Sequence, residues 1–197
     1  MELVVISSPK SENDEIETMV QLLDHGLYRL HLRKPDWSKD QVEALIAQIP
    51  VAYYPKISLH EHHELIEALG LGGRHFKSDQ TVHAGSGVGS KSFHDLAAME
   101  DDINHSLDYG FIGPVFDSIS KPGYRQQFTV EKIGDWIANH KRQLSFRLFA
   151  LGGIIPKHLP DLKLAGFDGA ALLGGVWNGT DTQERLNRFL TYKNIPL

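Results

Sequence analysis

The segment GPVFDSISKPGY, residues 113–124, places two serines and a lysine between glycine and proline residues, directly after the apolar run YGFI. Ser118 and Ser120 can each donate a hydroxyl hydrogen bond, and Lys121 adds a positive charge. Donors of this kind suit a phosphate group. The segment is therefore either half of an anion-binding site or a surface loop without a chemical role.

Two glycine pairs favour the first interpretation. Gly152 and Gly153 occur in ALGGI, and Gly174 and Gly175 occur in LLGGV. Because glycine has no Cβ, its backbone N–H group can approach an anion closely. One pair alone is equally well explained by a tight turn, but two pairs after two apolar runs predict phosphate binding.

The cluster HEHH, residues 60–63, offers imidazole and carboxylate ligands to a metal ion. It lacks the HExxH spacing of helical zinc sites, and the chain has no cysteine that could complete such a site. A solvated helix start is therefore the better explanation for most of the cluster. His60 differs, because it ends an apolar run.

The elements that must position these residues are short β-branched runs that alternate with segments of helical periodicity. We expect eight strands, at residues 2–7, 28–32, 56–59, 73–76, 87–90, 109–113, 147–151 and 169–173. Such strands pair in parallel, with a helix in each crossover. An open doubly wound sheet competes, but eight units favour an α/β fold of the (β/α)8 TIM barrel type, a single domain over residues 1–197.

Helix boundaries carry local signals. The expected N-cap residues are Ser38, Ser92 and Thr129. The glycines that should end helices are Gly26, Gly70 and Gly166.

A barrel of this kind carries its active site on the loops that follow the strands. Those loops are unusually polar here, and they contain His31, Arg33 and Lys34, then His60 to His63, then Lys77, Ser78 and Asp79, then Ser90, Lys91 and Ser92. The glycine pairs follow the seventh and eighth strands, where barrels often bind phosphate. His60 should point at the mouth of the barrel.

Composition limits the classes of function. The net charge of −5 and the absence of a basic patch give no electrostatic reason to bind nucleic acid or an anionic membrane. No apolar run approaches the roughly 20 residues of a membrane helix, and no signal peptide is evident. We expect a cytoplasmic protein with small-molecule partners; a homodimer is compatible with the sequence.

Four motifs in matching order resemble those of thiamine-phosphate synthases. LHLRKPDWS resembles the family segment QLRxK, GPVFDSISK resembles GPVFxTxTK, ALGGI resembles AIGGI, and AGFDGAALLGGVW resembles AGADGVAVVSAI. The resemblance implies a Mg²⁺-dependent barrel enzyme of thiamine biosynthesis. It would join a pyrimidine pyrophosphate to a thiazole phosphate and release pyrophosphate.

The resemblance also implies roles for individual residues. Arg33, Lys121, His60 and His31 would be catalytic, with Arg33 on the pyrophosphate. The substrate-binding residues would be Ser118, Ser120, Lys91, Gly152, Gly153, Leu173 and Gly174. Glu61 and Asp79 would hold Mg²⁺, which needs only one or two carboxylates besides substrate oxygens and water.

Several positions depart from the family pattern. His31 replaces a glutamine, His60 and Glu61 replace an asparagine–aspartate pair, and Pro35 replaces a lysine, with Lys34 one residue earlier. The second metal-binding aspartate aligns with Gln80, or with Asp79 after a shift of one residue.

Thiazole tautomerases share the barrel, so the resemblance leaves an isomerase as an alternative activity. That branch uses a histidine after the fifth strand, where this sequence has Lys91. Lysine is a poor base near neutral pH unless it is buried or beside another cation, so His31 or His60 would have to replace it. A catalytically silent barrel that only binds a phosphate ligand is the third possibility.

Overall fold

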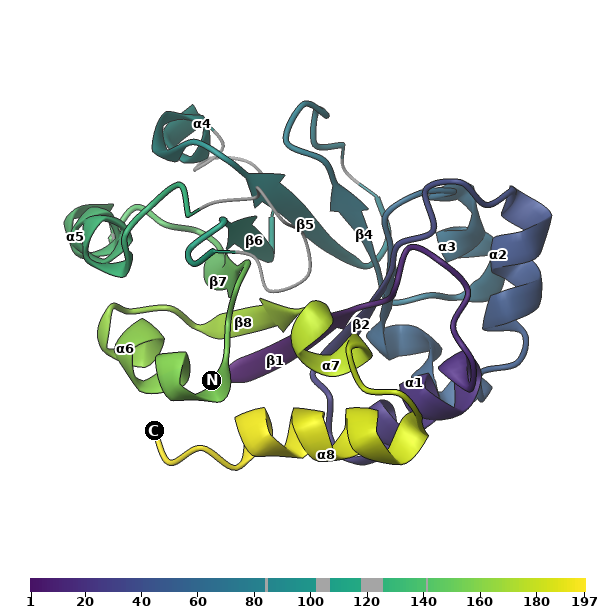
Figure 1. The fold of residues 1–197 in the computed structure, drawn as a ribbon. Coiled ribbons are helices and arrows are strands. Elements are labelled where there is room, and N and C mark those ends of the chain that lie inside the picture. Colours follow the sequence, from purple (N-terminus) through teal and green to yellow (C-terminus); the bar gives the residue numbers. More distant parts are fainter. Residues whose placement is uncertain (84, 102–106, 118–125, 141) are drawn as a thin grey trace.

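The computed structural model describes residues 1–83, 85–101, 107–117, 126–140 and 142–197. Its strands form one closed barrel in sequence order, and every neighbouring pair is parallel. They are β1 (Glu2–Ile6), β2 (Arg29–Leu32), β3 (Ile57–Leu59), β4 (Gly73–Phe76), β5 (Val88–Phe93), β6 (Tyr109–Ile112), β7 (Arg147–Leu151) and β8 (Gly169–Leu172). β1 lies between β2 and β8 and closes the barrel (Figure 1). The predicted barrel is confirmed.

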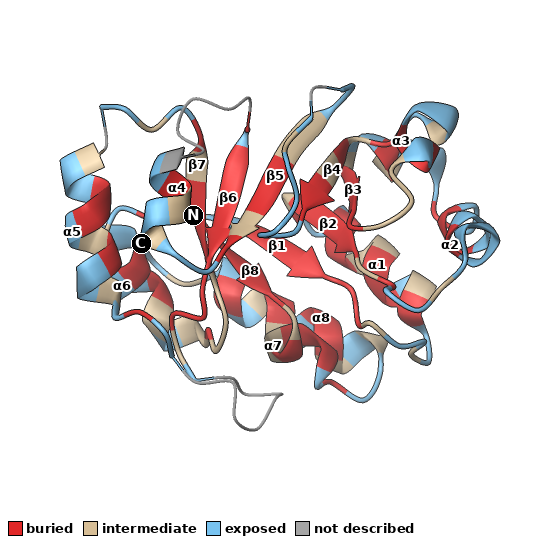
Figure 2. Ribbon diagram, turned by 90° about the horizontal axis from the view of Figure 1, so that it is seen from above, coloured by how far each residue is buried: buried red, intermediate tan, exposed pale blue. Residues whose placement is uncertain are grey.

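Helices surround the barrel. They are α1 (Glu15–Asp24), α2 (Lys39–Ile46), α3 (Glu64–Leu69), α4 (Leu96–Asp101), α5 (Val130–His140), α6 (Leu159–Leu164), α7 (Gly174–Trp177) and α8 (Thr182–Lys193), with 3₁₀ turns η1 (Val51–Lys56) and η2 (Pro156–His158). Their barrel-facing sides are buried and their outer sides exposed, whereas the strands are almost entirely buried (Figure 2). In the described ranges no helix has the length and apolar character needed to cross a bilayer.

The helix α2 shows how local sequence signals specify an element. Val42, Leu45 and Ile46 recur on one face and are buried against the strands. Ser38 accepts a hydrogen bond from the backbone N–H of Gln41, and the Gln41 side chain accepts one from the Ser38 N–H, which completes a capping box. The predicted cap at Ser38 is confirmed.

Two expectations about boundaries are wrong. β5 continues to Phe93 because Ser90, Lys91 and Ser92 pair with β6, so Ser92 is a strand residue and not an N-cap. The Asp95 carboxylate instead accepts a hydrogen bond from the N–H of Ala97 at the start of α4. The crossover from β4 to β5 also differs, because its described residues, 77–83 and 85–87, contain no helix.

The barrel interior has an apolar half and a polar half. β1, β6, β7 and β8 contribute an apolar cluster of Val4, Ile6, Tyr109, Phe111, Phe149 and Ala171. β2 to β5 contribute buried polar side chains: Arg29, His31, Ser58, His60, His75 and Ser90. Because successive side chains of a strand alternate between its faces, these residues occupy the inward positions. The polar half is the unusual one, since barrel interiors are dominated by branched apolar residues.

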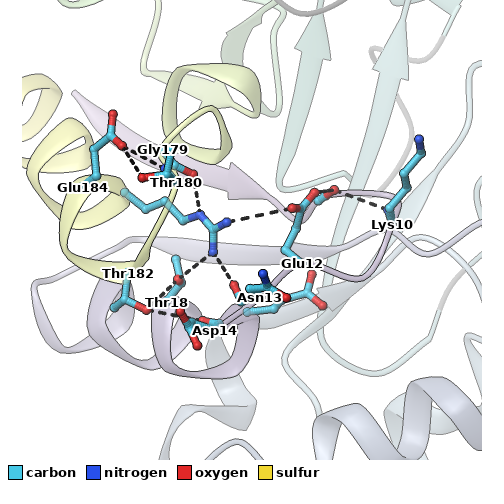
Figure 3. Close-up of polar contacts among 12 residues, drawn as sticks. Lys10, Glu12, Asn13, Asp14, Thr18, Gly179, Thr180, Thr182 and Glu184 are labelled. Atoms are coloured by element: carbon cyan, nitrogen blue, oxygen red, sulfur yellow. Dashed lines mark hydrogen bonds and ion pairs between the residues drawn. The ribbon is translucent and has the colours of Figure 1, made fainter.

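Arg185 of α8 connects the C-terminal helix to the segment after β1, and Figure 3 labels its neighbours Glu12, Asn13 and Gly179. Its guanidinium group is 3% exposed and donates hydrogen bonds to the carbonyl oxygens of Gly179 (3.0 Å) and Asn13 (2.6 Å). It also lies 3.9 Å from the Glu12 carboxylate. One buried cation thus links the segment after β1 to the segment between α7 and α8.

Candidate active site

A cavity of about 520 Å³ lies at the carboxyl ends of the strands. Seven of the predicted site residues line it: Arg33, His60, Asp79, Gly152, Gly153, Leu173 and Gly174. They come from the loops after five different strands, which is the arrangement expected of a barrel active site. The structure therefore brings these predicted residues together at the mouth of the barrel.

The loop after β7 depends on its two glycines. Gly152 and Gly153 have φ angles of +96° and +64°, a region that other residues rarely adopt. A Cβ on Gly153 would lie 2.2 Å from the carbonyl oxygen of Asp117 and 2.7 Å from Cβ of Phe116. The loops after β6 and β7 are thus in direct contact, and only glycine fits between them.

The glycine pair after β8 forms the first turn of α7. Gly174 and Gly175 line the cavity, and Gly174 is itself buried. The first N–H groups of a helix have no carbonyl partner within that helix. The cavity is therefore bordered on one side by two glycine loops whose backbone can come close to an anion.

Arg33 is the charged residue that faces these loops from β2. Its backbone N–H donates to Oγ of Ser7 (2.9 Å), and that hydroxyl donates to the carbonyl oxygen of Arg33 (3.2 Å). Ser7 directly follows β1, so this reciprocal pair fixes the β2 loop to the neighbouring strand. The pair fixes the backbone of Arg33, which lines the cavity, and a guanidinium group there suits a phosphate or pyrophosphate oxygen.

The turn after β4 places Asp79 and Gln80 differently. The Gln80 side chain accepts a hydrogen bond from the Lys77 N–H (2.7 Å), and the Gln80 N–H donates to the Lys77 carbonyl (3.1 Å). Gln80 therefore closes the turn, whereas Asp79 lines the cavity.

Glu61 lies beside this turn but does not itself line the cavity. Its side chain is 17% exposed, and neither carboxylate oxygen accepts a hydrogen bond from a described residue. Its nearest charged neighbour is Lys77, whose Nζ lies 3.6 Å from Oε1. A nearly buried carboxylate with free acceptor capacity, close to a turn that places Asp79 in the cavity wall, fits a Mg²⁺ ion.

Three histidines form a buried group behind the cavity wall. Nδ1 of His31 and Nε2 of His60 are 3.0 Å apart and share a hydrogen bond. His75 bonds Oγ of Ser90 through Nδ1 (2.9 Å) and Oγ of Ser92 through Nε2 (2.8 Å). His60 and His75 line the cavity, whereas His31 lies deeper and bonds the Tyr109 hydroxyl (2.5 Å). We call these three residues the histidine cluster.

Burial controls the charge of the histidine cluster. Desolvation lowers the pKa of His31 and His60 well below the usual value, and it lowers the pKa of His75 to about 3. The three rings are therefore neutral at neutral pH. Neutral rings donate and accept hydrogen bonds, but they are weak bases.

The sequence analysis missed His75. The signal was present in GRHF, residues 73–76, because the period of two in a strand puts His75 on the face opposite to Arg74 and Phe76. A histidine at an inward position near the end of a barrel strand is a site candidate by the same argument that selected His60.

Other predicted residues are not brought to the cavity. Lys91 alternates with Ser90 and Ser92, which point inward to His75, so Lys91 faces the helix layer instead. Its Nζ lies 5.8 Å from the centre of the Phe93 ring. Ser118, Ser120 and Lys121 lie outside the described residues.

These observations define a closed (β/α)8 barrel whose candidate site lies at the carboxyl ends of its strands and is bordered by glycine loops after β7 and β8. Within this class, the chain belongs to the thiamine monophosphate synthase family, whose model matches residues 3–176. The resemblance seen in the four motifs is confirmed.

Curated relatives carry the same family name. A thiamine-phosphate synthase of Bacteroides fragilis is 25% identical over 186 residues, which is 89% of this chain and 91% of that protein. One of Synechococcus is 29% identical over 100 residues, which is 51% of this chain but only 27% of that protein.

Solved structures agree with the fold. The crystal structure of thiamine phosphate pyrophosphorylase from Bacteroides thetaiotaomicron superposes with a TM-score of 0.82 at 28% identity and covers 99% of this chain and 97% of that one. A thiamine phosphate pyrophosphorylase from Pyrococcus furiosus gives a TM-score of 0.78, with coverage of 98% and 96%, at only 15% identity. That second likeness supports the fold alone.

Proposed function

We propose that the protein is a thiamine-phosphate synthase that joins hydroxymethylpyrimidine pyrophosphate to thiazole phosphate and releases pyrophosphate. The observation that carries this proposal is the convergence of Arg33, Asp79 and the two glycine loops on one cavity in a member of this family. The partners would be small-molecule phosphate and pyrophosphate substrates, and the reaction would take place in the cytoplasm.

Arg33 would stabilise the departing pyrophosphate. Negative charge grows on the pyrophosphate oxygens as the bond to the pyrimidine methylene breaks, and a guanidinium group beside them interacts more strongly with that growing charge than with the substrate. The family motif adds Ser118, Ser120 and Lys121 to the same task. The thiazole phosphate would then bind to the backbone of Gly152, Gly153, Leu173 and Gly174.

Glu61 and Asp79 would hold Mg²⁺. When bound, the ion neutralises pyrophosphate oxygens and assists their departure. Lys77 is the competing cation at Glu61, because its ammonium group is 3.6 Å from the carboxylate. Lys77 itself lines the cavity, so it is placed to contact a substrate oxygen if the ion displaces it from Glu61.

His60 and His75 would contact the pyrimidine or a phosphate as neutral hydrogen-bonding groups. His31 was predicted to be catalytic, but its place behind His60 supports a positioning role, since it is fully buried and bonded to His60 and Tyr109. The tautomerase alternative gains no base from Lys91, which faces away from the cavity, and its other candidates, His31 and His60, are weak bases because burial lowers their pKa.

The test is release of pyrophosphate from both substrates with Mg²⁺ present. Arg33→Ala should lower kcat/KM by about 10- to 100-fold, the loss expected for one charged hydrogen-bonding group of about 1.5–3 kcal/mol. Arg188→Ala is the matched control, because Arg188 lies on the exposed side of α8 and pairs with Glu184. Binding of thiazole phosphate without release of pyrophosphate would overturn the proposal.

A further inference from the structure

We propose that the histidine cluster, His31, His60 and His75, is a binding site for a transition-metal ion such as Zn²⁺ or Co²⁺, distinct from the carboxylates assigned to Mg²⁺. One ring nitrogen of each residue can be chosen so that all three lie within 4.8 Å of one another. They are the only such group of three ligands among the described residues. The inference does not depend on the synthase reaction.

The hydrogen bonds of His75 show which of its ring nitrogens carries the lone pair that a metal ion would need. The Ser90 hydroxyl donates to the carbonyl oxygen of Arg74 (3.2 Å), so its oxygen accepts the hydrogen bond from Nδ1 of His75. The proton of His75 is therefore on Nδ1, and Nε2 carries the lone pair, which meets the Ser92 hydroxyl at the cavity wall. Histidines that bind metals usually donate their second ring N–H to a fixed acceptor in this way.

His31 and His60 can bind an ion between them. Their facing nitrogens are 3.0 Å apart and share one proton. Two nitrogens on a tetrahedral Zn²⁺, at about 2.0–2.1 Å each, are about 3.3 Å apart, so an ion can take the place of that proton with little movement. The proton moves to the other ring nitrogen of the histidine that carried it. Nε2 of His31 remains bonded to the Tyr109 hydroxyl (2.5 Å), which orients the ring.

The chemistry of the ligands selects the ion. Neutral imidazoles bind Zn²⁺, Co²⁺, Ni²⁺ and Cu²⁺ well, whereas Mg²⁺ prefers oxygen ligands. Three protein nitrogens leave a fourth position open, and because His60 and His75 line the cavity, that position faces it.

The experiment uses the full chain without a purification tag, stripped of metal and titrated with Co²⁺. Tetrahedral Co²⁺ with nitrogen ligands absorbs visible light strongly, and we expect this absorption to saturate at one ion per chain. Zn²⁺ should abolish it by competition, and Mg²⁺ in large excess should not. X-ray absorption at the cobalt edge of the wild-type protein should show three imidazole ligands.

Variants locate the ion. His60→Gln and His75→Gln should weaken Co²⁺ binding by at least about 100-fold, since even a residue that only orients a ligand is worth 10- to 100-fold. His94→Gln is the matched control, because His94 lines the same cavity but bonds the carbonyl oxygen of Gly113 (3.0 Å). Glu61→Gln should also leave the absorption unchanged.

Three results would overturn the inference. They are the absence of tetrahedral absorption in the wild-type protein, an X-ray absorption spectrum with fewer than three imidazoles, and unchanged binding in folded His60→Gln or His75→Gln. The first two need no variant, so they decide the question even if a substitution in the buried cluster prevents folding.

Discussion

The proposed Mg²⁺ site rests mainly on the side chain of Glu61. A carboxylate that is mostly withdrawn from water normally accepts hydrogen bonds, yet neither oxygen of Glu61 does so from the described residues. The free-energy cost of burying an unpaired carboxylate falls when a cation binds. Nζ of Lys77, 3.6 Å from Oε1 of Glu61, offsets only part of that cost. Glu61 is therefore the residue on which the Mg²⁺ requirement should depend most.

We predict that Glu61→Gln raises the Mg²⁺ concentration for half-maximal pyrophosphate release by about 10-fold, because the neutral amide loses about 1.4 kcal/mol of charge interaction with the ion. A titration of activity with Mg²⁺ measures the shift. Glu67→Gln is the control, since Glu67 is an exposed acid on α3 that bonds Arg74 and Ser86. Equal Mg²⁺ dependence in all three proteins would remove Glu61 from the metal site.

Individual residues also show how far sequence reasoning reaches. Arg33 and the glycine pairs were placed correctly, because a strand end and a glycine motif are local signals. Lys91 was misplaced because the length of β5 is set by its pairing with β6, which is a contact with a distant segment. His31 was predicted to be catalytic, but it does not line the cavity, and its depth behind His60 depends on how three strands align around the barrel.

At the scale of an element, the loop after β7 shows a backbone shape that only glycine allows. Gly153→Ala should destabilise the protein by about 2–4 kcal/mol, from the left-handed φ and from collision with residues 116 and 117. It should also raise the KM for thiazole phosphate. Urea unfolding and steady-state kinetics measure the two effects.

Gly70→Ala is the matched control for this substitution. Gly70 also has a left-handed φ, of +71°, but no atom lies within 4 Å of an added Cβ. Gly70→Ala should lower the free energy of unfolding by only about 1 kcal/mol and leave the KM for thiazole phosphate unchanged. If both variants behave alike, contact between the loops after β6 and β7 does not shape the site.

The start of α8 is stabilised by charge. Glu184 accepts hydrogen bonds from the N–H and hydroxyl of Thr180 and pairs with Arg188, as Figure 3 shows for the threonine. The Thr180 N–H, followed by Arg188, lowers the pKa of Glu184 from 4.5 to about 2. A depressed pKa in the folded state adds stability above the unfolded value of 4.5, and that stability is lost as pH falls towards 2.

We therefore predict that Glu184→Gln lowers the free energy of unfolding above pH 4.5. The gap between the unfolding free energies of variant and wild type should narrow as the pH falls towards 2. Denaturant unfolding over this range measures it. A difference that stays constant with pH would mean that the carboxylate charge does not stabilise α8.

At the scale of the whole molecule, closure of the barrel joins the first and last parts of the chain. β1 pairs with β8, and α1 packs beside α8 (Figure 1). Arg185 lies within this junction and bonds backbone carbonyls from both sides. The sequence predicted the eight units, but nothing local indicated which buried cation would connect them.

Arg185→Met should lower the free energy of unfolding by about 3 kcal/mol, because it removes the donor to the carbonyl oxygens of Gly179, which is buried, and of Asn13. Arg188→Met is the control, since its exposed pair with Glu184 should be worth about 0.5 kcal/mol or less. Urea unfolding of both variants compares the two. Similar losses would show that Arg185 does not hold the junction together.

The polar half of the barrel interior has a spectroscopic consequence. Ring N–H protons of buried, hydrogen-bonded imidazoles exchange slowly with water, because exchange requires local opening of the structure. His31, His60 and His75 are all less than 7% exposed and hydrogen-bonded, so their ring protons should appear as separate proton NMR signals, far downfield of the amide region. Since two of these rings line the cavity, their proton signals should shift when a ligand enters it, and no isotope labelling is needed to observe them.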